Sequence, residues 1–231
     1  MPHRLFPDPA FTAVPVADSA ELYPVHRIFC VGRNYEDHAK EMGDVVDREA
    51  PFYFIKDALS VVMTGAATAY PPATQNLHHE VELVVYVGAP LFRATTEEAA
   101  QAVYGYGIGL DMTRRDVQNV AKGKGRPWDF GKNFEEGCVL APIVKAADVT
   151  LGAQRIWLSV DDAVRQESTL DAMVWSVPEI LSDLSRYYHL KPGDIVMTGT
   201  PAGVGAVVAG HVLTGGIDGI GEIALTIGEA E

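Results

Sequence analysis

Apolar residues along the chain gather in short runs that end at glycine or at an acidic residue. Many of these runs are rich in valine, isoleucine and aromatic residues, a composition typical of buried strands. Segments 156–162 and 164–168 predict a hairpin, because a polar turn separates them. The other predicted strand segments are 26–32, 51–65, 80–88, 104–113, 211–231 and 191–205, the last of which continues into a glycine-rich loop.

Helical spacing is found in two segments. Residues 35–43 carry acids in the first turn, follow Asn34 as an N-cap and end at Gly43, which predicts a helix of about two turns. Segment 174–190 places apolar residues on one face, with Pro178 in its first turn. No long repeat and no regular alternation of strands and helices occurs. The pattern therefore predicts a single β-rich domain of the α+β class.

The start of the chain has neither the two-residue period of a strand nor the period of a helix. Residues 1–24 carry five prolines and predict an extended N-terminal arm, followed by one domain over residues 25–231. The first residues lack the apolar core of a secretory signal. No segment approaches the roughly 18 apolar residues that cross a membrane. We therefore expect a cytoplasmic protein.

Composition and net charge restrict the classes of function and partner that the protein can have. Hydrophobic residues make up 48% and charged residues 21%, as in ordinary globular proteins. The formal net charge is −13, so the surface repels nucleic acids and anionic membranes, and we expect neither as a partner. Cys30 and Cys138 lie in mostly apolar or glycine-containing segments and are expected to be buried thiols without a disulfide.

Candidate metal ligands begin the segment 80–88. Glu80 and Glu82 are two apart, so in a strand both carboxylates point to one face. The residues that follow are apolar on both faces, which indicates a strand entering the core, where paired carboxylates need a cation. Asp111 ends another apolar run and supplies a third carboxylate. Oxygen ligands of this kind favour Mg²⁺, Mn²⁺ or Ca²⁺ over Zn²⁺.

Two alternatives remain open at this site. An isolated pair of acids is also typical of a solvated edge strand. His78 and His79 are either ligands of a softer metal or residues that pack beside the strand.

His38 and Glu41 are three apart on the predicted helix and so share a face. An imidazole held by a carboxylate can take a proton from water near neutral pH, which predicts a general-base dyad; an exposed helix pair is the alternative. Arg33 and Asn34 precede this helix at a position suited to anionic groups.

Lys56 and Lys132 both lie in apolar surroundings, which is uncommon for lysine. Lys132 is the better candidate for orienting a substrate carbonyl or enolate, and snorkelling to solvent is the alternative for each. The loop 199–205 lacks the ending of a phosphate loop. Its backbone N–H groups and the Thr200 hydroxyl are suited to binding a carboxylate.

Six motifs occur in order along the chain: GRNYEDHAKEMG, PFYFIKD, HHEVELVVYVG, GYGIGLDMTRRDVQ, GRPWDFGKNFEEG and KPGDIVMTGTPAGVG. Together they resemble the fumarylacetoacetate hydrolase family, and within it the branch of small acylpyruvases and fumarylpyruvate hydrolases. The resemblance runs from about Val25 to the end of the chain. It implies the fold of that family's C-terminal domain, a rolled, mixed β-sheet, in a protein that is usually a homodimer.

The resemblance also implies roles for individual residues. Glu80, Glu82 and Asp111 match metal ligands for Mg²⁺ or Mn²⁺, and His38 with Glu41 matches a dyad that activates water on a mobile lid. The residues implied to contact the substrate or stabilise its charge are Arg33, Arg115, Gln118, Lys132 and Thr200. The proline that often follows the family's lysine in the second motif is Asp57 here, which leaves the role of Lys56 open.

The implied activity is metal-dependent hydrolysis of a carbon–carbon bond in a small anionic 2,4-diketo acid. Fumarylpyruvate, cleaved to fumarate and pyruvate in the gentisate pathway of aromatic catabolism, is the expected acylpyruvate. Oxaloacetate decarboxylase and 2-hydroxyhepta-2,4-diene-1,7-dioate isomerase are alternatives within the family. A noncatalytic metal-binding module is a further alternative, but it has no need for His38, Glu41 and Lys132.

Overall fold

A computed structural model gives the fold of the chain and describes residues 5, 11–41, 43 and 48–230. Its centre is a mixed eight-stranded sheet in the order β4-β3-β15-β8-β9-β11-β5, with β12 paired to β9. β8 is buried along its whole length, as the apolar run over residues 83–87 predicts. The strands are β3 (Arg27–Gly32), β4 (Phe52–Lys56), β5 (Val61–Met63), β8 (Val81–Val87), β9 (Val103–Asp111), β11 (Cys138–Leu140), β12 (Val144–Lys145) and β15 (Asp194–Met197).

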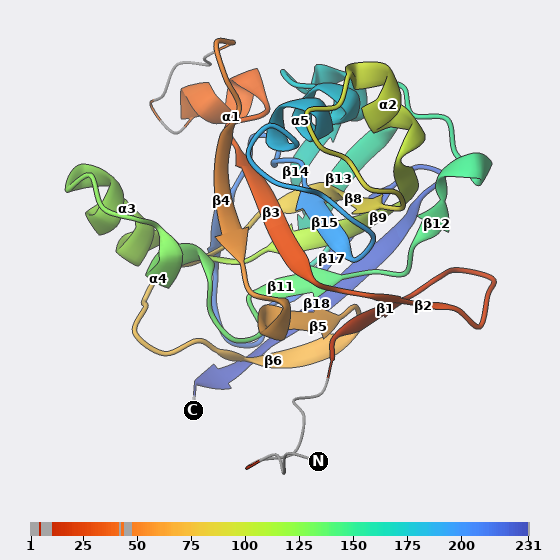
Figure 1. Cartoon of the computed structure of the whole chain (residues 1–231). Coiled ribbons are helices and arrows are strands. Elements are labelled where there is room, and N and C mark those ends of the chain that lie inside the picture. Colours follow the sequence, from red (N-terminus) through yellow and green to blue (C-terminus); the bar gives the residue numbers. More distant parts are fainter. Residues whose placement is uncertain (1–4, 6–10, 42, 44–47, 231) are drawn as a thin grey trace.

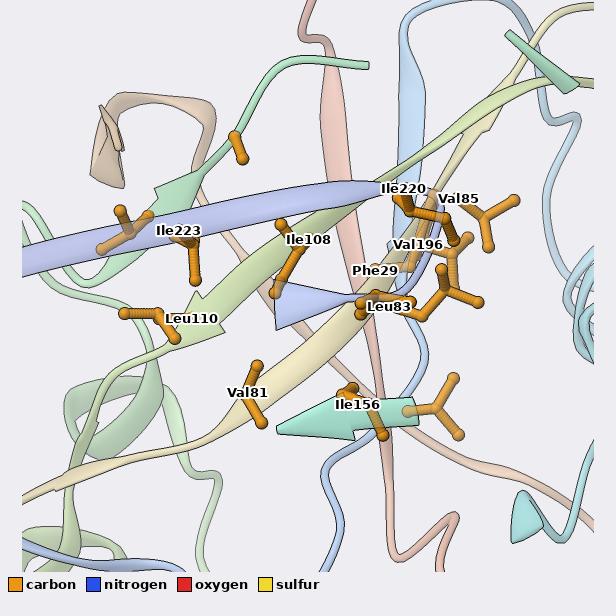
Figure 2. Packing of buried hydrophobic residues seen from close by; sticks show 14 of the residues in the cluster. Phe29, Val81, Leu83, Val85, Ile108, Leu110, Ile156, Val196, Ile220 and Ile223 are labelled. Atoms are coloured by element: carbon orange, nitrogen blue, oxygen red, sulfur yellow. The ribbon is translucent and has the colours of Figure 1, made fainter. Parts of the chain in front are cut away.

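A second sheet of five strands, in the order β14-β13-β17-β18-β6, packs against the first. Ile156 of β13 and Ile223 of β18 lie beside Leu83, Ile108 and other central-sheet residues in one apolar core (Figure 2). The predicted hairpin is confirmed as β13 and β14. The strands are β6 (Ala66–Tyr70), β13 (Arg155–Val160), β14 (Ala163–Thr169), β17 (Val212–Ile217) and β18 (Gly221–Ala230).

Two small sheets complete the strands: β1 (Ala13–Pro15) pairs with β2 (Leu22–Pro24), and β7 (Leu77–His79) lies between β10 (Thr113–Arg114) and β16 (Gly205–Val207). The β1–β2 hairpin falls inside the predicted arm. Val14 and Tyr23 are buried there, and the Tyr23 hydroxyl lies 2.7 Å from the carbonyl oxygen of Val87. Residues 13–24 therefore pack on the main body, while the division of the chain at residue 24 stays a prediction.

Helices lie around the rim of the sheets (Figure 1). The two predicted helices are present but shorter than expected, as α1 (Glu36–Glu41) and α5 (Val177–Leu184), and α5 begins with a capping box between Ser176 and Glu179. The polar segment after β10, for which we predicted no helix, forms α3 (Arg115–Gly123) and α4 (Asp129–Lys132), and α4 packs against β4. The remaining helices are α2 (Thr96–Gln101) and three short 3₁₀ turns at Ala58–Ser60, Ala146–Asp148 and Leu170–Ala172.

These elements confirm a β-rich α+β fold. Cys30 and Cys138 are buried free thiols, as expected. Among the described residues, the helices are all too short or too polar to span a bilayer.

Candidate active site

Three buried carboxylates meet where β8 begins and β9 ends. The two strands are antiparallel, with Glu82 opposite Gly109, and the Asp111 backbone N–H donates to the Glu80 carbonyl oxygen at 2.9 Å. Each of Glu80, Glu82 and Asp111 offers one carboxylate oxygen within 4.8 Å of the others, and all three side chains are buried. The solvated edge-strand alternative is therefore wrong for this pair of glutamates.

Two lysines contact the same carboxylates. Lys132 Nζ lies 2.7 Å from Glu80 Oε2, 2.7 Å from Asp111 Oδ2 and 2.8 Å from Thr113 Oγ1. Lys56 Nζ lies 2.8 Å from Asp111 Oδ1 and donates to the Gly137 carbonyl oxygen at 2.9 Å. Both lysines are buried, so neither snorkels to solvent. Lys56 thus fixes Asp111 to the backbone around it.

Arg115 lies on the other side of Glu80. Its Nη2 forms an ion pair with Glu80 Oε1, and its Nη1 donates to Gln118 Oε1 at 2.5 Å. Because the Gln118 oxygen accepts from Arg115, the amide nitrogen of Gln118 is the donor that this residue can offer to a ligand. The first turn of α3 positions both side chains.

The buried carboxylates differ in how many positive charges lie near them. Burial alone would raise the pKa of Glu80, but the charges of Lys132 and Arg115 outweigh it and hold that pKa well below the usual range. Burial, together with the nearby charges of Asp111 and Glu80, raises the pKa of Glu82 well above its usual value. Among the described residues no cation pairs with Glu82, and its Oε2 accepts only the Gly199 N–H, at 2.8 Å. A further cation is needed to hold Glu82 ionised.

A divalent ion fits this donor set. The three ligands are carboxylates without cysteine or histidine, which suits a hard ion such as Mg²⁺ or Mn²⁺. The two histidines lie elsewhere: His79 Nδ1 is 2.9 Å from Gln166 Oε1, and His78 Nε2 is 3.0 Å from Asn76 Oδ1. Both histidines therefore pack beside the strand.

His38 and Glu41 lie together on α1. His38 Nδ1 is 3.5 Å from Glu41 Oε2, which is ion-pair distance without hydrogen-bond geometry. Glu41 Oε2 also accepts the Gly203 N–H at 3.0 Å and so ties α1 to the loop 199–205. Burial lowers the pKa of His38, and the nearby charge of Arg115 adds to this, so the imidazole is neutral at neutral pH.

Asn34 has a different role from the predicted N-cap. Its Nδ2 donates to the carbonyl oxygens of Thr198 at 2.8 Å and Trp175 at 3.0 Å, and its Oδ1 accepts the Trp175 N–H at 2.7 Å. These bonds use the side chain to join the start of α1 to two loops of the site. The N-cap prediction is therefore wrong, because tertiary partners occupy the amide.

Thr200 and the glycine before it border the acids. The Thr200 hydroxyl donates to the Val81 carbonyl oxygen at 2.8 Å and accepts from Gln166 Nε2 at 2.7 Å. Gly199 has φ +95°, and a Cβ there would lie 2.8 Å from Asn34 Cβ, so glycine is required. The backbone N–H that we expected to bind a carboxylate donates to Glu82.

A pocket of about 500 Å³, counted to its open mouth, connects these residues. Asp111 and Glu41 are not among the described residues that line it. The predicted residues that line it are Arg33, His38, Glu80, Glu82, Arg115, Gln118, Lys132 and Thr200. The other lining residues, which we did not predict as part of a site, are Val31, Gly32, Phe54, Asn119, Lys122 and Trp128.

The rolled sheet and this pocket, with its buried acids, lysines and histidine, define an enzyme fold with a divalent metal site. The family model described as the C-terminal domain of fumarylacetoacetate hydrolase matches residues 27–228, and the chain belongs to this family.

Several relatives are similar over most of the chain. A fumarylpyruvate hydrolase from a Ralstonia species is 52% identical over 192 residues, which cover 82% of this chain and all of that protein. The oxaloacetate tautomerase YcgM of Escherichia coli is 41% identical over 85% of this chain and 90% of its own length. The crystal structure of a Pseudomonas aeruginosa fumarylpyruvate hydrolase with Mn²⁺ and pyruvate matches with a TM-score of 0.95 and 43% identity, covering 99% of this chain and all of that one.

Proposed function

We propose that this protein hydrolyses acylpyruvates, with fumarylpyruvate as the substrate and fumarate and pyruvate as the products, in the breakdown of aromatic compounds through gentisate. The observation that carries the proposal is the presence of His38 in the same pocket as Glu80 and Glu82, because hydrolysis needs both a base for water and a site for the diketo acid. The 52% identity to a fumarylpyruvate hydrolase supports this choice of substrate.

Glu80, Glu82 and Asp111 would hold Mg²⁺ or Mn²⁺. When bound, the ion supplies a Lewis acid for the carboxylate and 2-oxo oxygens of the substrate. The P. aeruginosa relative, which holds Mn²⁺, supports a divalent ion here.

The protein's own groups would move the protons. His38 Nε2 takes a proton from water, while the Glu41 carboxylate, 3.5 Å from Nδ1, stabilises the positive charge that forms on the imidazole. The hydroxide adds to the carbonyl carbon of the acyl group, and donors from Lys132 and Gln118 stabilise the negative oxygen that forms. The bond between that carbon and the pyruvyl methylene then breaks, its electron pair stays on the pyruvyl fragment, and this fragment takes a proton to become pyruvate.

A direct assay tests the proposal. We expect rapid loss of diketo-acid absorbance with fumarylpyruvate in the presence of Mg²⁺, slower loss with acetylpyruvate, and little loss when the ion is chelated. His38→Ala should lower kcat by about 10²–10⁴. Unchanged hydrolysis by His38→Ala would show that water activation lies elsewhere.

Tautomerisation of oxaloacetate is a second candidate, because the E. coli relative carries that activity in its name. Decarboxylation of oxaloacetate and isomerisation of a heptadienedioate also stay predictions. None of these reactions needs water to attack a carbonyl. If oxaloacetate conversion survives in His38→Ala while acylpyruvate hydrolysis is lost, the protein has both activities.

We also propose that the protein acts as a homodimer in the cytoplasm. The side chains of Phe11, Ile55 and Leu59 are 74%, 52% and 69% exposed, and apolar surface of this kind is commonly covered in interfaces. The free thiols of Cys30 and Cys138 suit a reducing compartment. Light scattering on the purified protein should give twice the chain mass of 24.9 kDa, and the chain mass itself would contradict the dimer.

A further inference from the structure

Thr200 lines the pocket together with His38, and the proton of its hydroxyl already has a partner. Thr200 Oγ1 lies 2.8 Å from the Val81 carbonyl oxygen, which can only accept, so the hydroxyl is the donor in this bond. Gln166 Nε2 lies 2.7 Å from the same Oγ1 and fills one of its two acceptor positions. What the hydroxyl can still offer a bound molecule is therefore its second acceptor position.

Backbone groups on both sides settle the orientation of the buried Gln166 amide. Its Oε1 accepts the Val81 N–H at 3.1 Å, and its Nε2 donates to the Pro201 carbonyl oxygen at 2.9 Å. The reversed amide would place N–H against N–H and oxygen against oxygen, which costs the hydrogen bonds of several buried groups. His79 Nδ1, 2.9 Å from Oε1, must then carry a hydrogen. Gln166 thus always presents a donor to Thr200, which keeps the hydroxyl proton on Val81.

A hydroxyl in this accepting state does not suit the carboxylate that we expected Thr200 to bind. A carboxylate has no hydrogen to donate, whereas a water molecule has two and can donate them in two directions. The loop that carries Thr200 is also tied to the helix of His38, because the Gly203 N–H donates to Glu41 Oε2 at 3.0 Å. A water between the loop and the helix can donate to Thr200 and to the imidazole at the same time.

We propose that the Thr200 hydroxyl accepts a hydrogen bond from the water that His38 deprotonates, and that Gln166 is a positioning residue that keeps Thr200 in the accepting state. One hydrogen of the water stays on Thr200 while the other passes to His38 Nε2, and an electron pair of the water oxygen forms the new bond to the acyl carbon. Holding the water in this orientation lowers the barrier to attack. The assignment rests on the proposed function, because hydrolysis is the reaction that needs an attacking water.

Thr200→Val tests the water contact, because it keeps the shape of the side chain and removes the hydroxyl. We expect kcat for fumarylpyruvate to fall about 10- to 100-fold while KM stays within about twofold. Calorimetry with the Mg²⁺-loaded protein should show that oxalate, an inert dianion, binds no more weakly, since no hydrogen bond to an anion is lost. Thr200→Ser keeps a hydroxyl and should restore most of the native kcat.

Thr198→Val is the matched control for Thr200→Val. Thr198 is also buried, and its hydroxyl also donates to a backbone carbonyl oxygen, that of Leu83 at 3.0 Å. It is not among the described residues that line the pocket. We expect this variant to keep kcat within about twofold of the native value, because the hydroxyl it removes does not reach the water.

Gln166→Met removes the donor to Thr200 and tests the positioning role. We expect kcat to fall in the same range, and the double variant with Thr200→Val to fall no further than Thr200→Val alone, because both changes act on one hydroxyl. Nitrogen NMR of the metal-free protein gives a readout without turnover. The His79 ring should carry a hydrogen on Nδ1, and a ring with its hydrogen on Nε2 alone would mean that the Gln166 amide is reversed, which overturns the proposal.

Other outcomes would also overturn the proposal. Weaker oxalate binding by Thr200→Val would show that the hydroxyl donates to an anion, and a raised KM with unchanged kcat would place the substrate, not water, on it. Losses in kcat that multiply in the double variant would show that Gln166 acts on packing alone. If the native protein hydrolyses no acylpyruvate, the proposed function itself fails. If it does and Thr200→Val keeps the native kcat, the water contact alone fails.

Discussion

At the scale of single residues, the site depends on how each buried acid is compensated. Glu80 has two cations, Arg115 and Lys132, and Asp111 has Lys132 and Lys56. Among the partners that the described part of the chain offers, Glu82 has only a backbone N–H. A buried acid without a paired cation lowers the stability of the metal-free protein. It is also the acid that a bound ion would stabilise most.

Glu82→Gln should therefore separate stability from metal binding. Without metal, its free energy of unfolding should lie within about 1 kcal/mol of the native value or above it, because an amide replaces an acid that burial already disfavours. Glu80→Gln should instead lower the free energy of unfolding by about 3–5 kcal/mol, since it removes the negative charge that pairs with Arg115 and Lys132. Urea unfolding in EDTA compares the two variants. A Glu82→Gln variant as unstable as Glu80→Gln would contradict this account of the charges.

His38 gives a prediction for pH. Burial lowers the pKa of its imidazole from the usual 6.5, so the neutral, proton-accepting form persists to lower pH. Hydrolysis should be constant through neutral pH and should fall only below pH 6.5, as the imidazole becomes protonated.

Glu41→Gln removes a partner that favours the protonated imidazole, so the acidic limb should move further down while kcat falls. The pH dependence of kcat for the native protein and this variant is the measurement. An acidic limb above pH 6.5 in the native protein would exclude His38 as the base.

At the scale of elements, the sequence predicts structures that form within one segment, such as a buried strand. It does not predict which distant segments contact each other. The run of apolar residues after Glu82 predicts a buried strand, and Asp111 at the end of β9 follows from the same kind of pattern. Helix α3 was not predicted, because its sequence is polar on average and its apolar residues, Val117, Val120 and Ala121, form a stripe of only about one turn. No pattern around Gln166 in the sequence marks it as a site residue, because its partners, the Val81 N–H and the Thr200 hydroxyl, are far from it along the chain.

Gln166 shows how the second sheet positions the site. It is fully buried in an otherwise mostly exposed strand, its Oε1 accepts the Val81 N–H at 3.1 Å, and its Nε2 donates to Thr200 at 2.7 Å. Gln166→Ala leaves several buried polar groups without a partner and should cost about 2–3 kcal/mol. For a chain of this size the melting temperature should fall by roughly 5–10 °C.

Glu167→Ala is the control for Gln166→Ala, because it removes only an exposed pair with Arg155 and should change stability by at most about 0.5 kcal/mol. Thermal unfolding of both variants gives the comparison. Equal melting temperatures would mean that Gln166 is not needed to hold β8 and Thr200.

At the scale of the whole molecule, net charge and local charge have opposite signs. The chain carries −13, yet four cations, Arg33, Arg115, Lys122 and Lys132, line one pocket, and the carboxylates among the described residues that line it are Glu80 and Glu82. The overall charge disfavours polyanion partners, as the sequence predicts, but it does not describe the site. A small anionic substrate is compatible with both facts because the pocket concentrates the cations.

Metal binding should stabilise the fold as a whole. Glu82 and Asp111 lie on β8 and β9, adjacent strands in the middle of the eight-stranded sheet, so an ion between them opposes unfolding of the entire core instead of a loop. At 100 times the dissociation constant, an ion that binds only the folded protein adds about 2.7 kcal/mol. The melting temperature should then rise by roughly 5–10 °C with Mg²⁺ or Mn²⁺. Glu82→Gln, which keeps the fold, should show little of this rise, and an equal rise in that variant would place the ion elsewhere.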